Sequence, residues 1–504
     1  MLGHDVVARG AQVGQAVVVK VMLDDQGAVR PTHGLSTVRF GTGRAAARVP
    51  VWVGCLLVRA TAQHTEVVAT PPLSPPSPSV DSLSDGEPVI RVQQSGPLDG
   101  TVRVAGAKNS VLKIMAASLL WPGRYTLRNV PRIADVRWMG ELLERMGATT
   151  TQEGDVLTID IPEEMTPEAP YDLVERMRAS IVVLGPLLAR FGEARVSVPG
   201  GDDFGHRPID MHLRGLEEMG ASFTTSHGYI EGRVERLLGA RVLLEFPSVG
   251  ATENLLMAAV MAKGTTVIDN AAREPEIADL ADFLNAMGAE VQGAGTSTIT
   301  VYGVERLRPA EHTVISDRIE AATYLVGLGL AGGEATIDGA CPDHMEMLVE
   351  KLTDMGMRIT ATADGLWAAA PARLRSVDLS TLPYPGLATD YKPLLVALLT
   401  TADGVGIVTE NVFAGRFRYV DELVRMGADI RAEGHHAVVR GVEVLSGAPV
   451  RAPDIRAGAA LVVAGLAAEG ETLVSAAHHV DRGYQDLVGN LARLGARVEL
   501  VAGT

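Results

Sequence analysis

Residues 264–291 read GTTVIDNAAREPEIADLADFLNAMGAEV and predict a strand, a helix and a second strand in succession. The first seven residues are rich in β-branched side chains, which predicts a strand. Apolar side chains then recur at i, i+3, i+7 and i+10 from Ile277 to Met287, which predicts an amphipathic helix. We expect Gly288 to end this helix, because glycine adopts the left-handed C′ conformation without a Cβ clash, and a second strand follows directly.

The corner at the end of this helix recurs along the chain. A Met-Gly or Leu-Gly pair occurs at six places, and the gaps between successive glycines are 73, 68, 68, 71 and 68 residues. A fixed period is the sequence signature of a repeated unit. This period is longer than that of the common solenoids, so each unit should be a small subdomain. The six corner glycines are Gly147, Gly220, Gly288, Gly356, Gly427 and Gly495.

Each unit also contains a second segment that is apolar all round. A helix without a polar face is either buried or membrane-spanning. These segments are far shorter than the ~20 residues that a bilayer requires, so we predict core helices and no membrane insertion. The expected fold therefore has helices inside, with sheets and amphipathic helices around them. The apolar segments are residues 111–120, 181–189, 255–262, 322–331, 393–399 and 459–467.

Composition limits the classes of protein to which this chain can belong. Its 504 residues leave room for two or three domains. The net charge of −16 argues against general nucleic-acid binding. Two cysteines do not make a disulfide framework, which is typical of a reducing compartment. We therefore expect a cytoplasmic protein with no nucleic-acid partner.

The first 88 residues stand outside the repeat. Proline and serine dominate residues 69–88, which is the composition of a disordered linker. The start of the sequence has no basic region followed by an apolar one and so does not resemble a secretory signal. We predict that residues 1–88 form an extension and a Pro/Ser-rich linker without stable structure.

Polar residues gather at the N-terminal ends of the six apolar segments. Helix N-termini carry roughly half a positive charge and free N–H groups, so several aimed at one place would bind an anion. The alternative is that Ser, Thr and Asp at these positions are ordinary N-caps. Lys or Arg beside most of these ends favours a polyanionic ligand. Examples are Lys108, Asn109, Arg178, Ser248, Asp317, Asp390, Asp454 and Arg456.

Residues 199–208, PGGDDFGHRP, form the most unusual segment. It combines three glycines with the adjacent carboxylates Asp202 and Asp203 and with Arg207. A loop this rich in glycine can move or approach a ligand closely. Arg416 and Arg482 each lie just after a predicted strand. Taken singly, each arginine is better explained as a solvated or salt-bridged residue.

Taken together, these motifs resemble the enolpyruvyl transferases over about residues 90–501. The motif GAKN resembles the members that act on UDP-N-acetylglucosamine more than those that act on shikimate 3-phosphate. The matching motifs are GAKN at 106–109, RAS at 178–180, PGG at 199–201, SVGAT at 248–252, AREPE at 272–276, DRIE at 317–320 and DRGY at 481–484.

The resemblance implies an α/β fold of two inside-out α/β barrel domains, each built from three repeated βαβ-type units. Three corner glycines precede Asp317 and three follow it, in agreement with that division. The implied boundaries are 89–107 plus 317–504 for the first, discontinuous domain and 108–316 for the second. The site would lie in the cleft between them and close around the substrates.

The resemblance also implies a reaction. Members of this branch transfer the enolpyruvyl group of phosphoenolpyruvate to the 3-hydroxyl of UDP-N-acetylglucosamine and release phosphate. This is the first committed step of peptidoglycan synthesis, which serves cell-wall formation, cell shape and cell division. The expected partners are these two small molecules, with no cofactor and no metal.

Roles follow from the motif match, residue by residue. Asp390 is the candidate base for the sugar hydroxyl, and Lys108 is expected to take part in catalysis as well as binding. The residues expected to bind phosphoenolpyruvate are Lys108, Asn109, Arg207 and Arg482. Those expected to bind UDP-N-acetylglucosamine are Arg178, Arg207, Pro208, Ile209, Asp210, Met211, Phe246, Pro247, Ser248, Val249, Asp390 and Val412. Further residues of the cleft are Arg416, Asp454 and Arg456.

Asp202 departs from the family pattern, in which most members carry a cysteine as proton donor and as target of the epoxide antibiotic fosfomycin. We expect Asp202 to be the proton donor, although its pKa must then be raised above the usual aspartate value of about 3.9 by burial or by anionic neighbours. We also expect insensitivity to fosfomycin, since a carboxylate is a poorer nucleophile than a thiolate. Phe246 is a second departure, because many members have a polar residue there.

Two alternatives remain open from the sequence. One is an enolpyruvyl transferase with another acceptor, such as shikimate 3-phosphate or a nucleotide. The other is a non-catalytic paralogue that binds a UDP-sugar, which the missing cysteine suggests. A phosphate-release assay with phosphoenolpyruvate and different acceptors separates these alternatives.

Overall fold

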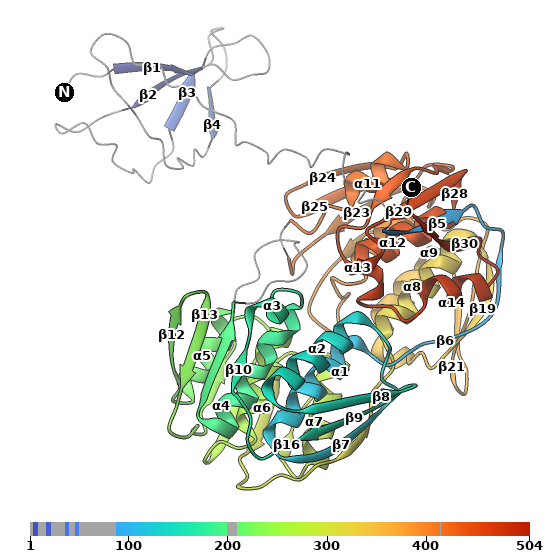
Figure 1. Cartoon of the computed structure of the whole chain (residues 1–504). Helices are drawn as coiled ribbons and strands as arrows, with labels where there is room; N and C mark the ends of the chain where they lie inside the picture. Colours follow the sequence, from blue (N-terminus) through green and yellow to red (C-terminus); the bar gives the residue numbers. More distant parts are fainter. Residues whose placement is uncertain are drawn as a thin grey trace. The chain divides into compact units, whose positions relative to one another are not determined.

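The computed structural model describes residues 4–8, 17–21, 36–39, 46–49, 87–198, 209–413 and 415–503 (Figure 1). The chain divides into two compact units, Met1–Ser82 and Leu83–Thr504. In the first unit, β1 (His4–Ala8) pairs antiparallel with β2 (Val17–Val21), and β3 (Ser36–Arg39) with β4 (Ala46–Val49). The rest of the segment for which we predicted disorder lies outside the described residues, and that prediction is untested.

The stretch at 264–291 folds as its pattern predicts. The expected strand is β15 (Thr265–Asp269), and the amphipathic helix is α7 (Pro275–Ala286). The following strand is β16 (Glu290–Gln292). β15 pairs antiparallel with β17 (Thr298–Tyr302), which pairs with β16, while β14 (Arg241–Leu243) adds to β15 in parallel. One unit therefore forms one four-stranded sheet and one covering helix.

The described residues form six four-stranded sheets with this same pattern of one parallel and two antiparallel pairs. The other five, in strand order, are β18 (Glu311–Thr313), β7 (Gly123–Arg128), β9 (Val156–Ile161), β8 (Thr149–Glu153); β10 (Glu168–Ala169), β11 (Glu193–Ser197), β13 (Tyr229–Arg233), β12 (Ser222–Ser226); β20 (Arg358–Ala361), β21 (Gly365–Ala370), β19 (Gly333–Asp338), β6 (Leu98–Arg103); β22 (Leu379–Ser380), β23 (Val405–Thr409), β25 (His436–Arg440), β24 (Asp429–Glu433); and β27 (Pro449–Arg451), β29 (Glu471–Ser475), β5 (Pro88–Gln93), β30 (Val498–Ala502).

The glycine corners are confirmed at all six positions. The φ angles of these glycines lie between 88° and 116°, a region that side chains with a Cβ rarely adopt. Each corner follows a helix that lies against its sheet. These helices are α2 (Ala134–Met146), α5 (Asp210–Glu218), α7, α9 (Glu346–Met355), α11 (Val420–Arg425) and α14 (Leu487–Arg493).

The six apolar segments are buried helices, as predicted. Figure 1 shows strands lying around them in each half of the second unit. In segment 111–120 the α-helix is followed by a 3₁₀ helix (Ser118–Leu120). At 181–189 a 3₁₀ helix (Arg178–Val183) precedes the α-helix. Pro186 explains this second 3₁₀ helix, because proline has no N–H to donate and its ring crowds the carbonyl four residues earlier. The helices are α1 (Lys108–Ala117), α4 (Leu184–Phe191), α6 (Val249–Ala259), α8 (Arg318–Ala331), α10 (Lys392–Leu399) and α12 (Ile455–Leu466).

The buried apolar side chains form two separate cores. One contains residues from Val111 to Val314, and the other joins β5 and β6 to residues from Ile319 onward. β6 pairs with β19, and β5 lies between β29 and β30, so the start of this unit completes sheets of its C-terminal half. The domain boundaries given above remain our proposal. Among the described residues, no helix is long and apolar enough to cross a membrane.

Candidate functional site

The start of α1 places Lys108 beside a buried carboxylate. Lys108 Nζ lies 2.7 Å from Asp135 Oδ2, and Arg482 Nε donates a hydrogen bond to Asp135 Oδ1 at 3.0 Å. Asp135 lies in the first turn of α2, and Arg482 follows the short helix α13 (His478–Asp481). All three side chains are buried. Two of the cations predicted to bind phosphoenolpyruvate therefore share one carboxylate.

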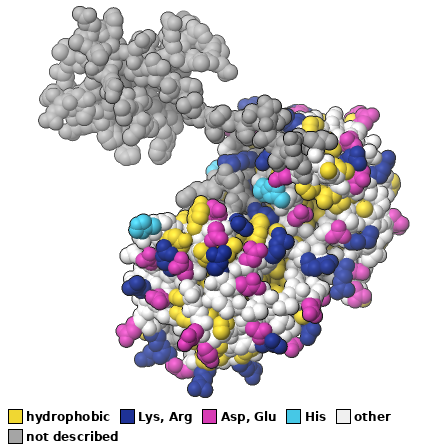
Figure 2. Space-filling view, in the orientation of Figure 1, with side chains coloured by type: hydrophobic (Ala, Val, Ile, Leu, Met, Phe, Trp, Pro, Cys, Tyr) yellow, Lys and Arg dark blue, Asp and Glu magenta, His cyan; other side chains and the backbone are white. Residues whose placement is uncertain are grey.

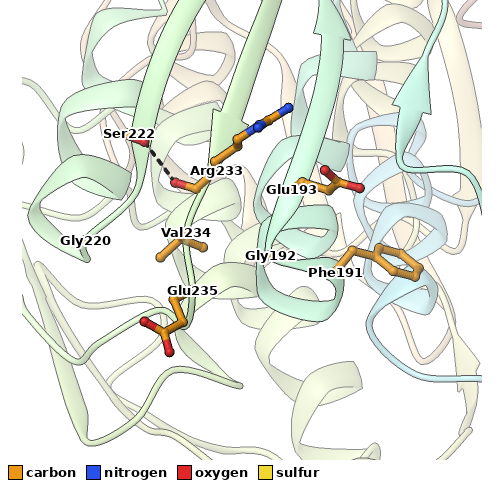
Figure 3. A pocket seen from close by; sticks show the side chains of 8 residues that line it. All are labelled: Phe191, Gly192, Glu193, Gly220, Ser222, Arg233, Val234 and Glu235. Carbon is orange, nitrogen blue, oxygen red and sulfur yellow. Dashed lines mark hydrogen bonds between the residues drawn. The ribbon is translucent and has the colours of Figure 1, made fainter.

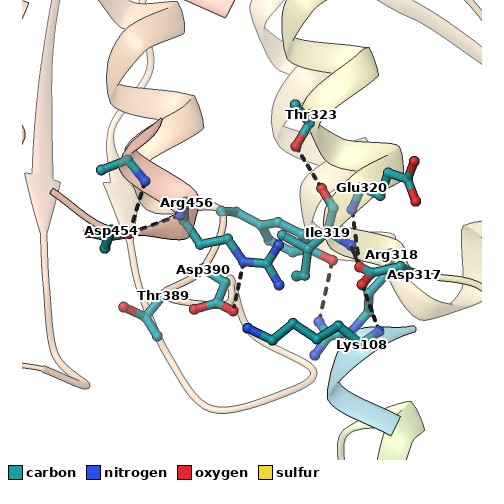
Figure 4. Close-up of polar contacts among 12 residues, drawn as sticks. Lys108, Asp317, Arg318, Ile319, Glu320, Thr323, Thr389, Asp390, Asp454 and Arg456 are labelled. Carbon is teal, nitrogen blue, oxygen red and sulfur yellow. Dashed lines mark hydrogen bonds and ion pairs between the residues drawn. The ribbon is translucent and has the colours of Figure 1, made fainter. Parts of the chain in front are cut away.

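Asp317 connects two of the buried helices at their N-termini. Its Oδ1 accepts hydrogen bonds from the N–H groups of Ile319 and Glu320, which caps α8. Its Oδ2 accepts a hydrogen bond from the N–H of Lys108 at 3.1 Å. Figure 4 shows the Lys108 side chain extending from this point toward Asp390. The N-cap interpretation is thus correct for Asp317, which also fixes the start of α1.

N-capping also accounts for Asp454 and Ser248. Asp454 Oδ1 accepts hydrogen bonds from the N–H groups of Arg456 and Ala457 at the start of α12. Ser248 Oγ accepts one from the N–H of Ala251 at the start of α6. These two polar side chains therefore stabilise helix starts, and in doing so they fix the backbone beside the site.

Asp390, the candidate base, is held between two arginines. Arg416 Nη1 donates to Asp390 Oδ1 at 2.9 Å. Arg456 Nε donates to Oδ2 of the same carboxylate at 3.4 Å (Figure 4). Burial raises the pKa of Asp390, but the positive charges of these arginines lower it more, so that it lies well below its usual range. The positive charge of Lys108 lowers this pKa further. Asp390 is therefore ionised at neutral pH and can accept a proton.

Glu410 fixes the segment that carries Val412. Its carboxylate accepts hydrogen bonds from the N–H groups of Val412 at 2.8 Å and Phe413 at 3.0 Å. Lys392 Nζ lies 2.9 Å from Glu410 Oε2. Burial lowers the pKa of Lys392 to about 8, and Glu410 counteracts part of that effect. The backbone at Val412 and Phe413 is therefore held by a carboxylate that also belongs to a buried ion pair.

A second group of predicted residues lies around His212. Burial and the nearby charge of Arg178 lower the pKa of His212 to about 4, while Asp210 raises it. The imidazole is therefore neutral, and its Nδ1 lies 3.0 Å from Asn254 Nδ2. Burial also lowers the pKa of Arg178. Ile209 and Met211 are half-buried beside Asp210 at the start of α5.

The remaining predicted residues have simpler surroundings. Phe246 is exposed, and Pro247, Ser248 and Val249 are half-buried where the chain enters α6. The carbonyl oxygen of Asn109 accepts a hydrogen bond from Lys113 Nζ at 2.7 Å. Three further predicted residues, Asp202, Arg207 and Pro208, lie outside the described residues.

The sequence did not predict which carboxylates pair with the buried lysine and arginine side chains. Arg318 at the start of α8 makes a bidentate pair with Glu276 on α7, at 3.0 Å and 3.3 Å. Asp135 and Glu410 were likewise missed. Asp135 gives no distinctive signal, because carboxylates are common in the first turn of any helix.

A depression of about 450 Å³ lies elsewhere, beside β11, β12 and β13 (Figure 3). In it, Ser222 Oγ donates a hydrogen bond to the carbonyl oxygen of Arg233 at 3.2 Å. None of the predicted site residues lines this depression, so we place the candidate site at the cluster around Asp390 and not here. The lining residues of the depression are Phe191, Gly192, Glu193, Gly220, Ser222, Arg233, Val234 and Glu235.

Figure 2 shows Lys and Arg side chains interspersed with Asp and Glu over most of the visible face of the second unit. Ion pairs at the surface of the described residues agree with this mixture, such as Arg124 with Asp160 at 2.8 Å. The buried cations around Asp390 and Asp135 thus contrast with a surface of mixed charge.

Comparison with known proteins identifies the family. The family model described as EPSP synthase (3-phosphoshikimate 1-carboxyvinyltransferase) matches residues 92–491. The chain therefore belongs to the EPSP synthase family of enolpyruvyl transferases. Among solved structures, the enolpyruvyl transferase NikO from Streptomyces tendae is 28% identical with a TM-score of 0.76, over 83% of this chain and all of that chain. An EPSP synthase from Acinetobacter baumannii has the same fold. It is 18% identical, with a TM-score of 0.65, over 82% of this chain and all of that chain.

Within this family, curated relatives of one name share about half of their residues with this chain. A UDP-N-acetylglucosamine 1-carboxyvinyltransferase from Mycobacterium tuberculosis is 51% identical over 404 residues, which are 80% of this chain and 97% of that protein. UDP-N-acetylglucosamine 1-carboxyvinyltransferase 1 from Caldanaerobacter subterraneus subsp. tengcongensis is 50% identical over 407 residues, 81% of this chain and 98% of that protein. These identities are well above that to NikO.

Proposed function

We propose that the protein is a UDP-N-acetylglucosamine 1-carboxyvinyltransferase, which moves the enolpyruvyl group of phosphoenolpyruvate to the 3-hydroxyl of UDP-N-acetylglucosamine and releases phosphate. The observation that carries the proposal is identity of about half of all residues to curated relatives of that name, over 97–98% of their length. The buried cations beside Asp135 and Asp390 support it, because both substrates are anionic. The reaction places the protein in peptidoglycan synthesis in the cytoplasm, and so in cell-wall formation, cell shape and division.

The chemistry requires a proton at C3 of phosphoenolpyruvate, removal of a proton from the sugar hydroxyl, and fixed partners for the developing charges. In our proposal Lys108, Arg207 and Arg482 bind the phosphate and carboxylate groups, with Asn109 beside them. Arginine suits this role because its planar fork bonds oxyanions bidentately. Asp202 supplies the proton to C3 as the sugar oxygen bonds to C2. A C3 proton is then lost as the C2–phosphate bond breaks, which restores the double bond of the transferred group.

Asp390 accepts the hydroxyl proton in this proposal. Its pairing with Arg416 and Arg456 keeps it ionised, and the same charges lower its basicity. Arg456 and Arg416 also stabilise the carboxylate's orientation toward the sugar. The UDP-sugar is bound by Arg178, residues 207–211, residues 246–249 and Val412, with backbone contacts in place of a polar side chain at Phe246.

One assay tests the proposal against its two alternatives. Phosphate release is measured with phosphoenolpyruvate and, in parallel, UDP-N-acetylglucosamine, shikimate 3-phosphate or a nucleotide without the sugar. We expect release only with UDP-N-acetylglucosamine. Release only with another acceptor would favour a redirected transferase, and tight UDP-sugar binding without release would favour a non-catalytic paralogue.

A further inference from the structure

We infer that Asp135 is a positioning residue that sets the geometry of two phosphoenolpyruvate-binding cations, an inference that rests on the proposed function. Its Oδ2 lies 2.7 Å from Lys108 Nζ, and its Oδ1 accepts the hydrogen bond of Arg482 Nε at 3.0 Å. Each carboxylate oxygen therefore engages a different cation. One side chain fixes both the separation and the direction of the two positive charges.

Helix stabilisation does not account for this carboxylate. α2 begins after Ile133 with no side-chain cap, and the oxygens of Asp135 point instead to Lys108 and Arg482. Only 1% of Asp135 is exposed, and a buried charge is costly unless it is paired. Its burial is thus explained by the two cations.

The arrangement also suits an anionic ligand. Asp135 holds the two cations beside one another, so that one anion can contact both. Asp135 engages Arg482 at Nε, and this fixes the plane of the guanidinium, whose terminal nitrogens form the fork that binds oxyanions. The centroid of the Trp138 ring lies 5.6 Å from the guanidinium carbon of Arg482, which is within the range of a cation–π interaction. Asp135 therefore acts on the ligand through Arg482 and Lys108.

The contact also joins distant parts of the chain. Asp135 and Arg482 are separated by 347 residues and contribute to different halves of the second unit. Their separation in space depends on how the two halves meet. A buried bond at this point holds the Arg482 side chain at a fixed place relative to Lys108, which lies on the same half as Asp135.

The test compares the full chain with the variant Asp135→Asn, which keeps the shape and removes the charge. The matched control is Asp172→Asn, an exposed aspartate 3.5 Å from Arg145. Phosphate release is measured while phosphoenolpyruvate and UDP-N-acetylglucosamine are varied separately. We expect Asp135→Asn to raise KM for phosphoenolpyruvate ~10- to 100-fold, the usual cost of misplaced binding groups, and to leave KM for the UDP-sugar unchanged.

Two outcomes would overturn the inference. An unchanged or lower KM for phosphoenolpyruvate would mean that Asp135 does not position the cations, or competes with the substrate for them. An equal rise in both KM values with a lower unfolding midpoint would mean a purely structural role.

A double-mutant comparison supplies a second measurement. In the Arg482→Lys background, the Nε bond is already lost, so we expect Asp135→Asn to cost less than it does in the wild type. If the two substitutions raise KM for phosphoenolpyruvate independently, so that their fold-changes multiply, Asp135 does not act through Arg482. Calorimetry of phosphoenolpyruvate binding to the wild type and to Asp135→Asn keeps the inference separate from the proposed function. If the wild type binds phosphoenolpyruvate but shows no turnover, the proposed function fails. The effect of Asp135→Asn on the affinity for phosphoenolpyruvate then still tests the inference.

Discussion

The buried carboxylate of Glu253 should make the stability of this protein depend on pH. Glu253 lies on the buried helix α6, is 1% exposed, and among the described residues its two carboxylate oxygens have no hydrogen-bond partner. Lys113 Nζ lies 3.5 Å away, too far for a strong hydrogen bond. Burial raises the pKa of Glu253 from 4.5 to about 7, and Lys113 offsets only part of this rise.

The sign of the pH effect follows from the raised pKa. The folded protein holds the Glu253 proton more tightly than the unfolded chain, so this group stabilises the fold fully below pH 4.5. That stability is lost as the pH rises through about 7. A rise in pKa from 4.5 to about 7 corresponds to about 3 kcal/mol at most.

The perturbation is Glu253→Gln, which cannot ionise. Urea unfolding of the wild type and the variant at a series of pH values from 4.5 to 8 gives the difference in unfolding free energy. We expect this difference to move in favour of the variant by about 3 kcal/mol across the range and then to level off. Glu305→Gln, at a side chain that is 79% exposed, is the matched control. A difference that is flat with pH, or that moves in favour of the wild type, would mean that the pKa of Glu253 is not raised in the folded protein.

Three further predictions concern other charged side chains. Arg318→Met leaves Glu276 buried without its bidentate partner, so thermal unfolding should show a loss of about 3 kcal/mol or more in the free energy of unfolding. Arg124→Met, in an exposed pair, should leave the unfolding midpoint unchanged. Equal effects of the two substitutions would contradict this prediction. If Asp202 is the general acid, Asp202→Asn loses turnover, and full activity of this variant would rule the role out. Turnover of the wild type should also fall on the alkaline side at a lower pH than turnover of Asp202→Cys, because the ordinary side-chain pKa is about 3.9 for Asp and about 8.5 for Cys. Mass spectrometry should find no covalent fosfomycin adduct on the wild type and an adduct on Asp202→Cys, and an adduct on the wild type would refute the expected insensitivity.

Much of the fold could be predicted from the sequence because its signals are local. The stripe from Ile277 to Met287 and the glycine that follows it need only neighbours in the chain, and the helix and the positive φ of Gly288 are both present. The 3₁₀ helix before α4 was missed because an all-apolar run does not distinguish helix types. Pro186 was the available signal.

The site could be predicted only in part. Lys108, Asp390 and Arg482 belong to motifs that can be recognised in the sequence, and the structure gives each of them a buried ionic partner. The partners themselves could not be predicted, because pairing such as that of Asp135 with Arg482 spans 347 residues and depends on how the units pack. Local patterns carry no information about such pairs.

The most direct test of the account is identification of the product. Purified full-length protein is incubated with phosphoenolpyruvate and UDP-N-acetylglucosamine, and the nucleotide is analysed by mass spectrometry and NMR. We expect one enolpyruvyl group on the 3-oxygen of the sugar for each phosphate released. An unmodified UDP-sugar, or an enolpyruvyl group found only on another acceptor, would contradict it.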